Sequence, residues 1–233
     1  MKHKARVKGV LLDIDGTLVL SNDAHARAWV EAFAAHGLQV RFEDVRPLIG
    51  MGADRVVPAL APTLTESEGV GKEINEIRQR IFLTRYAPDL QPAPGSRELI
   101  ERLRSNGVRL AIASSAQTHE LETLLKVARI EDLVEMPNGG SEGKQSKPSP
   151  DVVAASLQRA QLRAEDAFML GDTPFDILAA QKCGLRTIAL RCGGWGDARL
   201  RDAAAIYDDP ADLLRHYEAS PLGASVTSEQ HGH

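Results

Sequence analysis

The sequence is poor in aromatic residues and in cysteine. Aromatic residues make up 4% of the 233 residues, so any core must be built from Ala, Val, Leu and Ile, as in many α/β proteins. The cysteines, Cys183 and Cys192, are too few for a disulfide framework, and their neighbours have no metal-ligand spacing. We therefore expect two ordinary thiols in a reducing compartment.

Long apolar runs and clusters of basic residues are also missing. No apolar run approaches the length of a membrane span. The basic residues 1–8 lead into an apolar run that Asp13 and Asp15 interrupt, so we expect no export signal. The formal net charge of −4, without a basic run, argues against nucleic acid as a partner. We expect a cytoplasmic protein with neither a membrane nor a nucleic-acid partner.

The chain does contain short apolar runs that alternate with helical stretches. The runs, typical of buried parallel strands, are residues 7–14, 108–113, 167–170, 185–190 and, more weakly, 204–207. The helical stretches between them open near prolines, at residues 94, 150 and 174. This alternation predicts an α/β fold, with a Rossmann-like, doubly wound parallel sheet covered by helices on both faces.

One region interrupts the alternation after the first predicted strand. Residues 22–86 have helical periodicity and no convincing strand. We expect residues 20–89 to form an inserted helical cap, and residues 1–19 and 90–219 to form the core. The last residues, 220–233, are rich in Ser, Gly and His, and we expect them to be disordered.

The strongest chemical signal is Asp-Ile-Asp-Gly-Thr-Leu, residues 13–18, directly after the first predicted strand. Ligands of parallel sheets bind at the carboxyl ends of the strands. Two carboxylates leaving a buried strand, Asp13 and Asp15, need a cation or protons to compensate them. Oxygen ligands of this type suit Mg²⁺. Taken alone, the segment would also fit a polar turn that closes a strand.

Asp172 and Asp176 form a second acidic group after another predicted strand. Asp172 leaves the strand, and Asp176 lies in the first turns of the next helix, facing back toward the same edge. A plain helix start, with Asp172 as cap and Pro174 in the first turn, is an equally good explanation of this segment alone.

Lys147 and Ser114 complete the set. Two prolines restrict where Lys147 can point, and Ser114 ends a predicted strand, although a lysine is usually solvated and such a serine is usually a turn or cap. All of these segments would meet at one edge of one sheet. A carboxylate nucleophile, further acids for a cation, a hydroxyl and a lysine match the requirements of phosphoryl transfer.

Together the motifs resemble the haloacid dehalogenase superfamily, in its capped phosphatase branch. The matching motifs occur in the family's order and spacing. They are Asp13-x-Asp15-Gly-Thr17, Ser114, Lys147-Pro and Gly171-Asp172-x-x-x-Asp176. The resemblance runs from about Lys8 to about Tyr217.

The resemblance implies a catalytic role for each matching residue. Asp13 would attack phosphorus and become an aspartyl phosphate. Asp15 would protonate the leaving oxygen and then activate the water that hydrolyses this intermediate. Ser114 and Lys147 would bind the phosphoryl oxygens, and Thr17 would help to fix the loop and Asp15.

The resemblance also implies a Mg²⁺ cofactor. The carboxylates of Asp13 and Asp172 and the main-chain carbonyl of Asp15 would bind the ion. Asp176 would hold metal-bound water or orient these ligands. The family's dehalogenases lack an acid at the position of Asp15, so the chain resembles the phosphate-handling members.

Two cap residues are candidates for substrate contact. His25 opens His-Ala-Arg-Ala-Trp, which is similar to a stretch of beta-phosphoglucomutase and of several sugar-phosphate phosphatases. A polar residue on the first cap helix is the alternative. The loop Gly50–Arg55 is a candidate for substrate selection, with Arg55 displaced by about two positions from the mutase's arginine. Trp29, at helical spacing with its apolar neighbours, is predicted to be core.

One segment departs from the family pattern. Residues 136–146 are rich in glycine where relatives carry an apolar, acidic turn. The segment lacks P-loop spacing, so we expect a mobile surface loop. Lys144 within it is a rival to Lys147, which the following proline favours.

The sequence predicts a Mg²⁺-dependent phosphatase that hydrolyses small phosphate monoesters, with phosphoglycolate and small sugar phosphates both open. A beta-phosphoglucomutase-like phosphomutase is the first alternative, disfavoured because residues 80–86 lack the mutase's Lys-Asn pair. A noncatalytic binding protein on this fold is the second, disfavoured by the intact acids. We expect a small phosphorylated metabolite as partner, and a monomer or small homo-oligomer.

Overall fold

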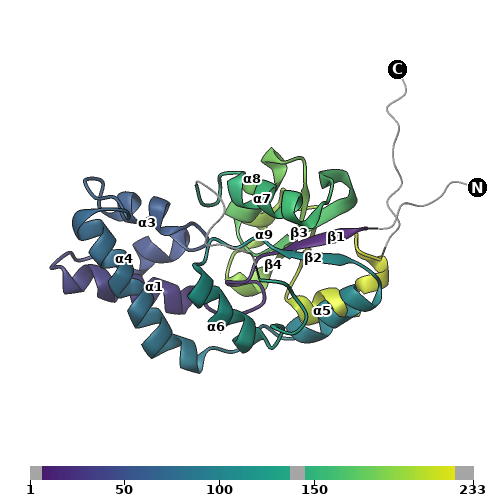
Figure 1. The fold of residues 1–233 in the computed structure, drawn as a ribbon, viewed down its shortest axis with the longest axis horizontal. Coiled ribbons are helices and arrows are strands. Elements are labelled where there is room, and N and C mark those ends of the chain that lie inside the picture. Colours follow the sequence, from purple (N-terminus) through teal and green to yellow (C-terminus); the bar gives the residue numbers. More distant parts are fainter. Residues whose placement is uncertain (1–6, 137–144, 224–233) are drawn as a thin grey trace, which may run out of the picture.

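The protein folds around a five-stranded parallel sheet with the strand order β2-β1-β3-β4-β5 (Figure 1). The computed structural model describes residues 7–136 and 145–223. The strands are β1 (Gly9–Leu12), β2 (Arg109–Ile112), β3 (Ala167–Gly171), β4 (Arg186–Leu190) and β5 (Ala205–Tyr207). Each lies within, or within one residue of, an apolar run predicted to be a strand.

Alternate residues of the strands face two helical layers. Val10 and Leu12 of β1 pack on one side of the sheet, and Leu11 packs on the other. The first side is covered by α5 (Ser96–Ser105), α6 (Thr118–Ala128) and α10 (Pro210–Arg215). The second side is covered by α7 (Asp151–Ala160) and α8 (Pro174–Lys182), while the short α9 (Asp197–Leu200) packs beside α8. The predicted fold class is confirmed.

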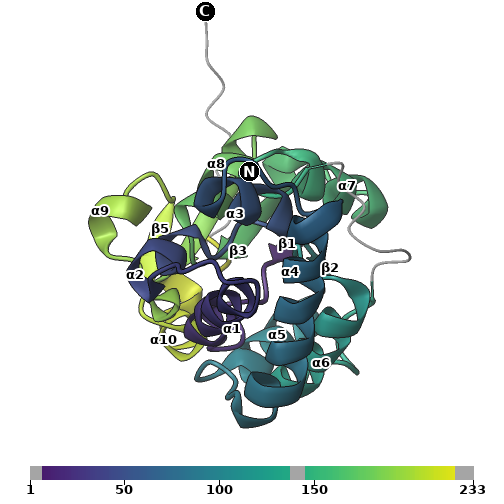
Figure 2. The ribbon, with the colours of Figure 1, turned by 90° about the vertical axis from the view of Figure 1, so that its left-hand side faces the viewer.

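A group of helices stands between β1 and β2 in the sequence and forms its own core. These helices are α1 (Asn22–Ala35), α2 (Phe42–Val45), α3 (Ala53–Leu60) and α4 (Gly69–Ile81), which runs into a π-helical turn, Phe82–Tyr86. Trp29, Phe33 and Ile74 are buried among them. Figure 2 shows these helices in front of the sheet.

Two connecting segments join this cap to the core. They run side by side, because the Leu20 N–H donates to the Gln91 carbonyl at 3.1 Å and the Ala93 N–H donates to the Leu18 carbonyl at 2.9 Å. The predicted cap boundaries, at residues 20 and 89, lie next to these two hydrogen-bonded segments.

The strand order places a crevice between β1 and β3. From β1 the chain moves outward to β2 and then returns past β1 to β3. In doubly wound sheets, ligands bind outside the carboxyl ends of the strands at such a reversal. The Asp13 N–H donates to the Leu170 carbonyl at 2.9 Å, so the motif after β1 starts in register with the end of β3.

Several predictions concern the chain ends and one internal segment. Of the predicted tail, residues 220–223 are described, and Ser220 and Leu222 are buried. Residues 224–233 and residues 137–144, with Lys144, lie outside the described residues. Within the described part of the chain, no helix is long and apolar enough to cross a membrane.

Candidate active site

Three buried carboxylates and one buried lysine meet at the carboxyl ends of β1 and β3. Lys147 Nζ lies 2.5 Å from Asp13 Oδ1 and 2.6 Å from Asp176 Oδ1. Oxygens of Asp13, Asp172 and Asp176 all lie within 4.8 Å of one another. The structure thus brings the predicted residues of three separate motifs into one cluster.

The turn after β1 is shaped by Gly16 and Thr17. Gly16 has φ +75°, and a Cβ there would lie 2.2 Å from Asn22 Nδ2 and 2.4 Å from Asp172 Oδ2. The Thr17 hydroxyl lies 2.9 Å from Asp13 Oδ2 and 3.0 Å from Asp172 Oδ1. Thr17 therefore connects the two strand ends through Asp13 and Asp172, whereas the sequence had suggested a contact with Asp15.

Asp176 belongs to the start of α8 as well as to the cluster. Thr173 is the N-cap, and its hydroxyl accepts from the Asp176 N–H at 3.1 Å, while Asp176 Oδ2 accepts from the Thr173 N–H at 3.0 Å. The other oxygen of Asp176 accepts from Lys147. The helix-cap and functional explanations of this segment are therefore both compatible with one geometry.

Burial and mutual repulsion dominate the electrostatics of the cluster. Burial raises the pKa of Asp13 to about 7, against the opposing attraction of Lys147. Burial, with repulsion from Asp13 and Asp176, raises the pKa of Asp172 well above its ordinary value. For Lys147, burial lowers the pKa, but the attraction of Asp13 and Asp176 outweighs it and raises the value. One lysine thus leaves the three carboxylates undercompensated.

The cluster fits a magnesium ion by its donor chemistry. Asp172 is held by uncharged groups, the Thr17 hydroxyl and the Asn22 amide, whose Nδ2 donates to Asp172 Oδ2 at 2.8 Å. A Cβ on Gly193 would lie 1.7 Å from the same oxygen, so no side chain is tolerated there. Converging carboxylate oxygens without a full complement of cations are what Mg²⁺ binds in proteins.

Asp15 lies apart from the cluster and has different partners. Ser21 Oγ donates to Asp15 Oδ1 at 2.5 Å, and His25 Nε2 lies 2.8 Å from the same atom. Burial by itself would raise the pKa of Asp15, but His25 and Ser21 outweigh it and lower the value. The His25 ring stacks on Phe82 with centroids 3.8 Å apart, which fixes its orientation. The pKa values of Asp13 and Asp15 are therefore shifted in opposite directions.

A buried ion pair between cap and core forms the far wall of the site. Arg78 Nη1 on α4 lies 3.0 Å from both carboxylate oxygens of Glu120 on α6. Arg78 Nη2 lies 3.3 Å from Asn75 Oδ1, and the guanidinium carbon lies 5.1 Å from the Trp29 ring centre. Glu120 Oε1 also lies 3.6 Å from His25 Nδ1. This network extends from Asp15 into the cap.

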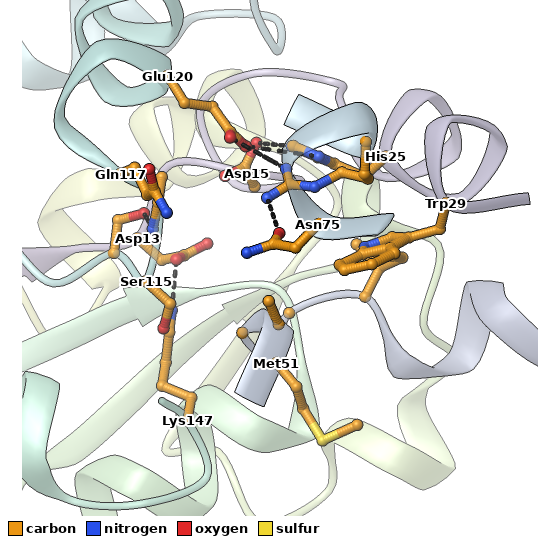
Figure 3. A pocket seen from close by; sticks show the side chains of 17 residues that line it. Asp13, Asp15, His25, Trp29, Met51, Asn75, Ser115, Gln117, Glu120 and Lys147 are labelled. Carbon is orange, nitrogen blue, oxygen red and sulfur yellow. Dashed lines mark hydrogen bonds and ion pairs between the residues drawn. The ribbon is translucent and has the colours of Figure 1, made fainter. Parts of the chain in front are cut away.

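These groups surround a pocket of about 100 Å³ between core and cap (Figure 3). Ser114 lines it, and its hydroxyl accepts from the Ala116 N–H at 3.1 Å. The loop Gly50–Gly52 lines it as well, and so does Trp29, which is buried in the cap as predicted. Arg55 is not among the lining residues, and its guanidinium instead lies 2.8 Å from Gln145 Oε1.

Sequence reasoning did not find several residues of the site, and only one of them had a usable signal. Ser21 lies four residues before His25, a helical spacing that places both against Asp15. Asn22 contacts Asp172, and Arg78 contacts Glu120, across long sequence separations that leave no local signal. Asn75, Ser115 and Gln117 line the pocket without belonging to any of the motifs.

Comparison with known proteins agrees with this geometry. The chain is 30% identical over 188 residues to phosphoglycolate phosphatase 1 of Pseudomonas aeruginosa, covering 79% of this chain and 69% of the relative. The structure is similar to that of a hydrolase from Pseudomonas syringae, with a TM-score of 0.82, 25% identity and coverage of 91% and 98% of the two chains.

A putative beta-phosphoglucomutase from Bacteroides vulgatus has the same fold, with a TM-score of 0.79 and coverage of 93% of this chain and 89% of that chain, at 19% identity. The sequence profile of the haloacid dehalogenase-like hydrolases matches residues 10–190, which span β1 to the end of β4. The chain belongs to the family of haloacid dehalogenase-like hydrolases.

Proposed function

We propose that this protein is a Mg²⁺-dependent phosphatase that hydrolyses small phosphate monoesters through an aspartyl phosphate on Asp13. The observation that carries the proposal is the placement of Asp13 and Asp15 at one strand end with separate sets of partners. Asp13 lies beside Lys147 in the carboxylate cluster, and Asp15 is held by Ser21 and His25. The names of the phosphoglycolate phosphatase relatives support the reaction class.

The carboxylate of Asp13 is oriented for attack. One oxygen is held by Lys147 and the other by the Thr17 hydroxyl, so the side chain cannot rotate freely. In the first step an oxygen of Asp13 forms a bond to phosphorus as the ester P–O bond breaks. Lys147 and Ser114, which line the pocket, would stabilise the charge on the phosphoryl oxygens.

Asp15 would serve both steps as acid and then as base. It protonates the leaving oxygen of the ester in the first step. In the second step it takes a proton from water, whose oxygen attacks phosphorus while the bond to Asp13 breaks. His25 Nε2, 2.8 Å from Asp15 Oδ1, is placed to exchange a proton with it.

Magnesium completes the charge balance of the site. When bound, Mg²⁺ would neutralise charge on the phosphoryl group. Asp13 and Asp172 would bind the ion with their carboxylates and Asp15 with its main-chain carbonyl. Asp176 would orient these metal ligands through its contacts with Lys147 and Thr173.

The test is phosphate release from a panel of small phosphate esters, including phosphoglycolate and hexose phosphates, with Mg²⁺ present. Asp13→Asn is expected to lower kcat at least about 10³-fold, because the nucleophile is lost. The matched control is Asp202→Asn, which makes the same change on the exposed surface and should keep full activity. Full activity in Asp13→Asn would exclude this nucleophile.

A second assay separates hydrolysis from the transfer of a phosphoryl group between two positions of one sugar. A phosphomutase would convert beta-glucose 1-phosphate in the presence of a bisphosphate primer without net release of phosphate. If the wild-type protein releases no phosphate from any ester but converts that sugar, the chain is a mutase.

A further inference from the structure

Six ionisable side chains line the pocket. They are Asp13, Asp15, His25, Arg78, Glu120 and Lys147. Lys147 is engaged by Asp13 and Asp176 at 2.5 and 2.6 Å. The other lining cation is Arg78, and its partner decides what the wall around the leaving group can bind.

Arg78 is neutralised in place. Its Nη1 lies 3.0 Å from both oxygens of Glu120, and both side chains are at least nine-tenths buried. A buried charge that has such a partner attracts a further anion weakly, because the partner repels that anion at nearly the same distance. Asp15 and Glu120 would repel a carboxylate that entered this part of the pocket.

The remaining polar groups of this wall are uncharged. Asn75, Ser115 and Gln117 line the pocket, and Figure 3 shows them around the same space as Asp13 and Lys147. Within residues 7–136 and 145–223, two buried polar atoms of the lining have no hydrogen-bond partner, Ser115 Oγ and Arg78 Nε. Buried polar atoms in a native protein usually have a partner. Both atoms are covered by protein here, so a ligand hydroxyl would reach them when cap and core shift on binding.

We propose that the leaving group of the substrate is uncharged and carries hydroxyl groups, and that the pocket discriminates against a carboxylate at the same position. This inference rests on the proposed function and selects, within it, short polyol and sugar phosphates over phosphoglycolate. The pocket volume of about 100 Å³ favours a small leaving group, since pockets that hold drug-sized ligands measure about 300–1,000 Å³.

Two pairs of esters that differ only in this group test the proposal. They are 2-hydroxyethyl phosphate against phosphoglycolate, and glycerol 3-phosphate against 3-phosphoglycerate. With Mg²⁺, kcat/KM for the hydroxyl member of the better pair should exceed that for the carboxylate member at least about tenfold, because like charges repel in the buried site. An equal or higher kcat/KM for the carboxylate member overturns the inference and leaves the hydrolase intact.

Glu120→Gln should weaken the preference for the hydroxyl ester by freeing the charge of Arg78. We expect the ratio of carboxylate to hydroxyl kcat/KM to rise about tenfold, whatever happens to the absolute rates. Glu122→Gln makes the same change on the exposed side of α6, outside the pocket, and should leave the ratio unchanged. An unchanged ratio in a folded Glu120→Gln protein would contradict the role given to the ion pair.

Ser115→Ala supplies a test that does not depend on a buried charge. Because Ser115 Oγ has no partner within the described residues, its removal should not lower the melting temperature. The variant should lose about fivefold in kcat/KM for the hydroxyl esters and keep its rate for the carboxylate esters. An equal loss for both members of a pair counts against the inference. Absence of phosphate release from all four esters and from the wider panel would instead reject the proposed function.

Discussion

The two sides of the pocket, here called the floor and the roof, differ in how their buried charges are balanced. The floor, formed by Asp13, Asp172, Asp176 and Lys147 from the core, holds more negative than positive charge in a buried place. The roof, which the cap forms with α6, pairs its buried arginine with Glu120. The floor therefore lacks positive charge, which we propose a bound Mg²⁺ ion supplies, whereas the ion pair of the roof is already balanced.

This difference separates chemistry from selection. Buried charges that have no full set of partners in the protein can interact with the reacting groups when these bind. A wall whose charges are paired contributes shape and neutral hydrogen bonds instead. On the proposed function, the floor supplies the chemistry, and the roof, with Arg78 from the cap and Glu120 from the core, selects among esters.

The largest expected effect comes from breaking the floor. Lys147→Met removes the lysine that, within the described part of the chain, contacts both Asp13 and Asp176, which leaves buried carboxylates unpaired. The variant should lose about 3–5 kcal/mol of unfolding free energy at pH 8, measured with urea, and at least about 10²-fold in kcat. Saturating Mg²⁺ should restore part of the stability but not the activity.

Lys126→Met is the control for that change. Lys126 is an exposed lysine in the last turn of α6, and its substitution removes the same charge outside the cluster. It should change the unfolding free energy by less than about 0.5 kcal/mol. A Lys147→Met protein as stable as this control would mean that the floor does not depend on the lysine for compensation.

Mg²⁺ and pH give the next largest effect. Because the pKa of Asp13 is raised from 3.8 to about 7 and that of Asp172 is also raised, the folded protein keeps protons that the unfolded chain releases. Stability of the metal-free protein should therefore fall as pH rises from about 4 to 7. Mg²⁺ replaces those protons, so its stabilisation should grow over the same range and reach about 3 kcal/mol at a hundredfold excess over Kd.

Thermal unfolding at pH 5 and pH 8, with EDTA and with Mg²⁺, measures this dependence. EDTA should also abolish phosphate release, and Mg²⁺ should restore it. Equal stabilisation by Mg²⁺ at both pH values would show that the ion does not compete with the protons of the cluster.

The smallest effect is expected where the roof touches the segment that carries Lys147. Ser146 Oγ accepts from the Gly52 N–H at 2.9 Å, which joins the cap loop to the residue before Lys147. Ser146→Ala should cost about 1 kcal/mol of stability and raise KM about two- to threefold, with kcat nearly unchanged. Ser105→Ala, at the exposed end of α5, is the matched control. A large drop in kcat would place Ser146 in the chemistry itself.

The strands of the core and the site residues at their ends could be predicted from local sequence patterns. Each strand is a short apolar run followed by a polar residue, and parallel strands bring their carboxyl ends to one edge, so Asp13 and Asp172 had to be near one another. Ser114 was found by the same reasoning, and Lys147 from the two prolines beside it ahead of a helix. The structure brings all four residues to one edge of the sheet.

The contacts of the roof could not be predicted from local patterns. Arg78 and Glu120 come from different helices and lie 42 residues apart in the sequence, and nothing near either residue indicates the other. Arg55, chosen from loop position alone, contacts Gln145 and is not part of the lining. Helical periodicity predicts that a cap helix exists but not which neighbour its polar residues will meet.

The sequence by itself determined the α/β class, the helical insertion and the acidic motifs, because strand and helix periods and strand-end polarity are local properties of the chain. Only the tertiary structure decided that Thr17 serves Asp13 and Asp172, that Asp15 pairs with Ser21 and His25, and that Glu120 neutralises Arg78. These contacts depend on the distance and burial of side chains brought together by packing, and a charge acquires its chemical role only from the partners it meets there.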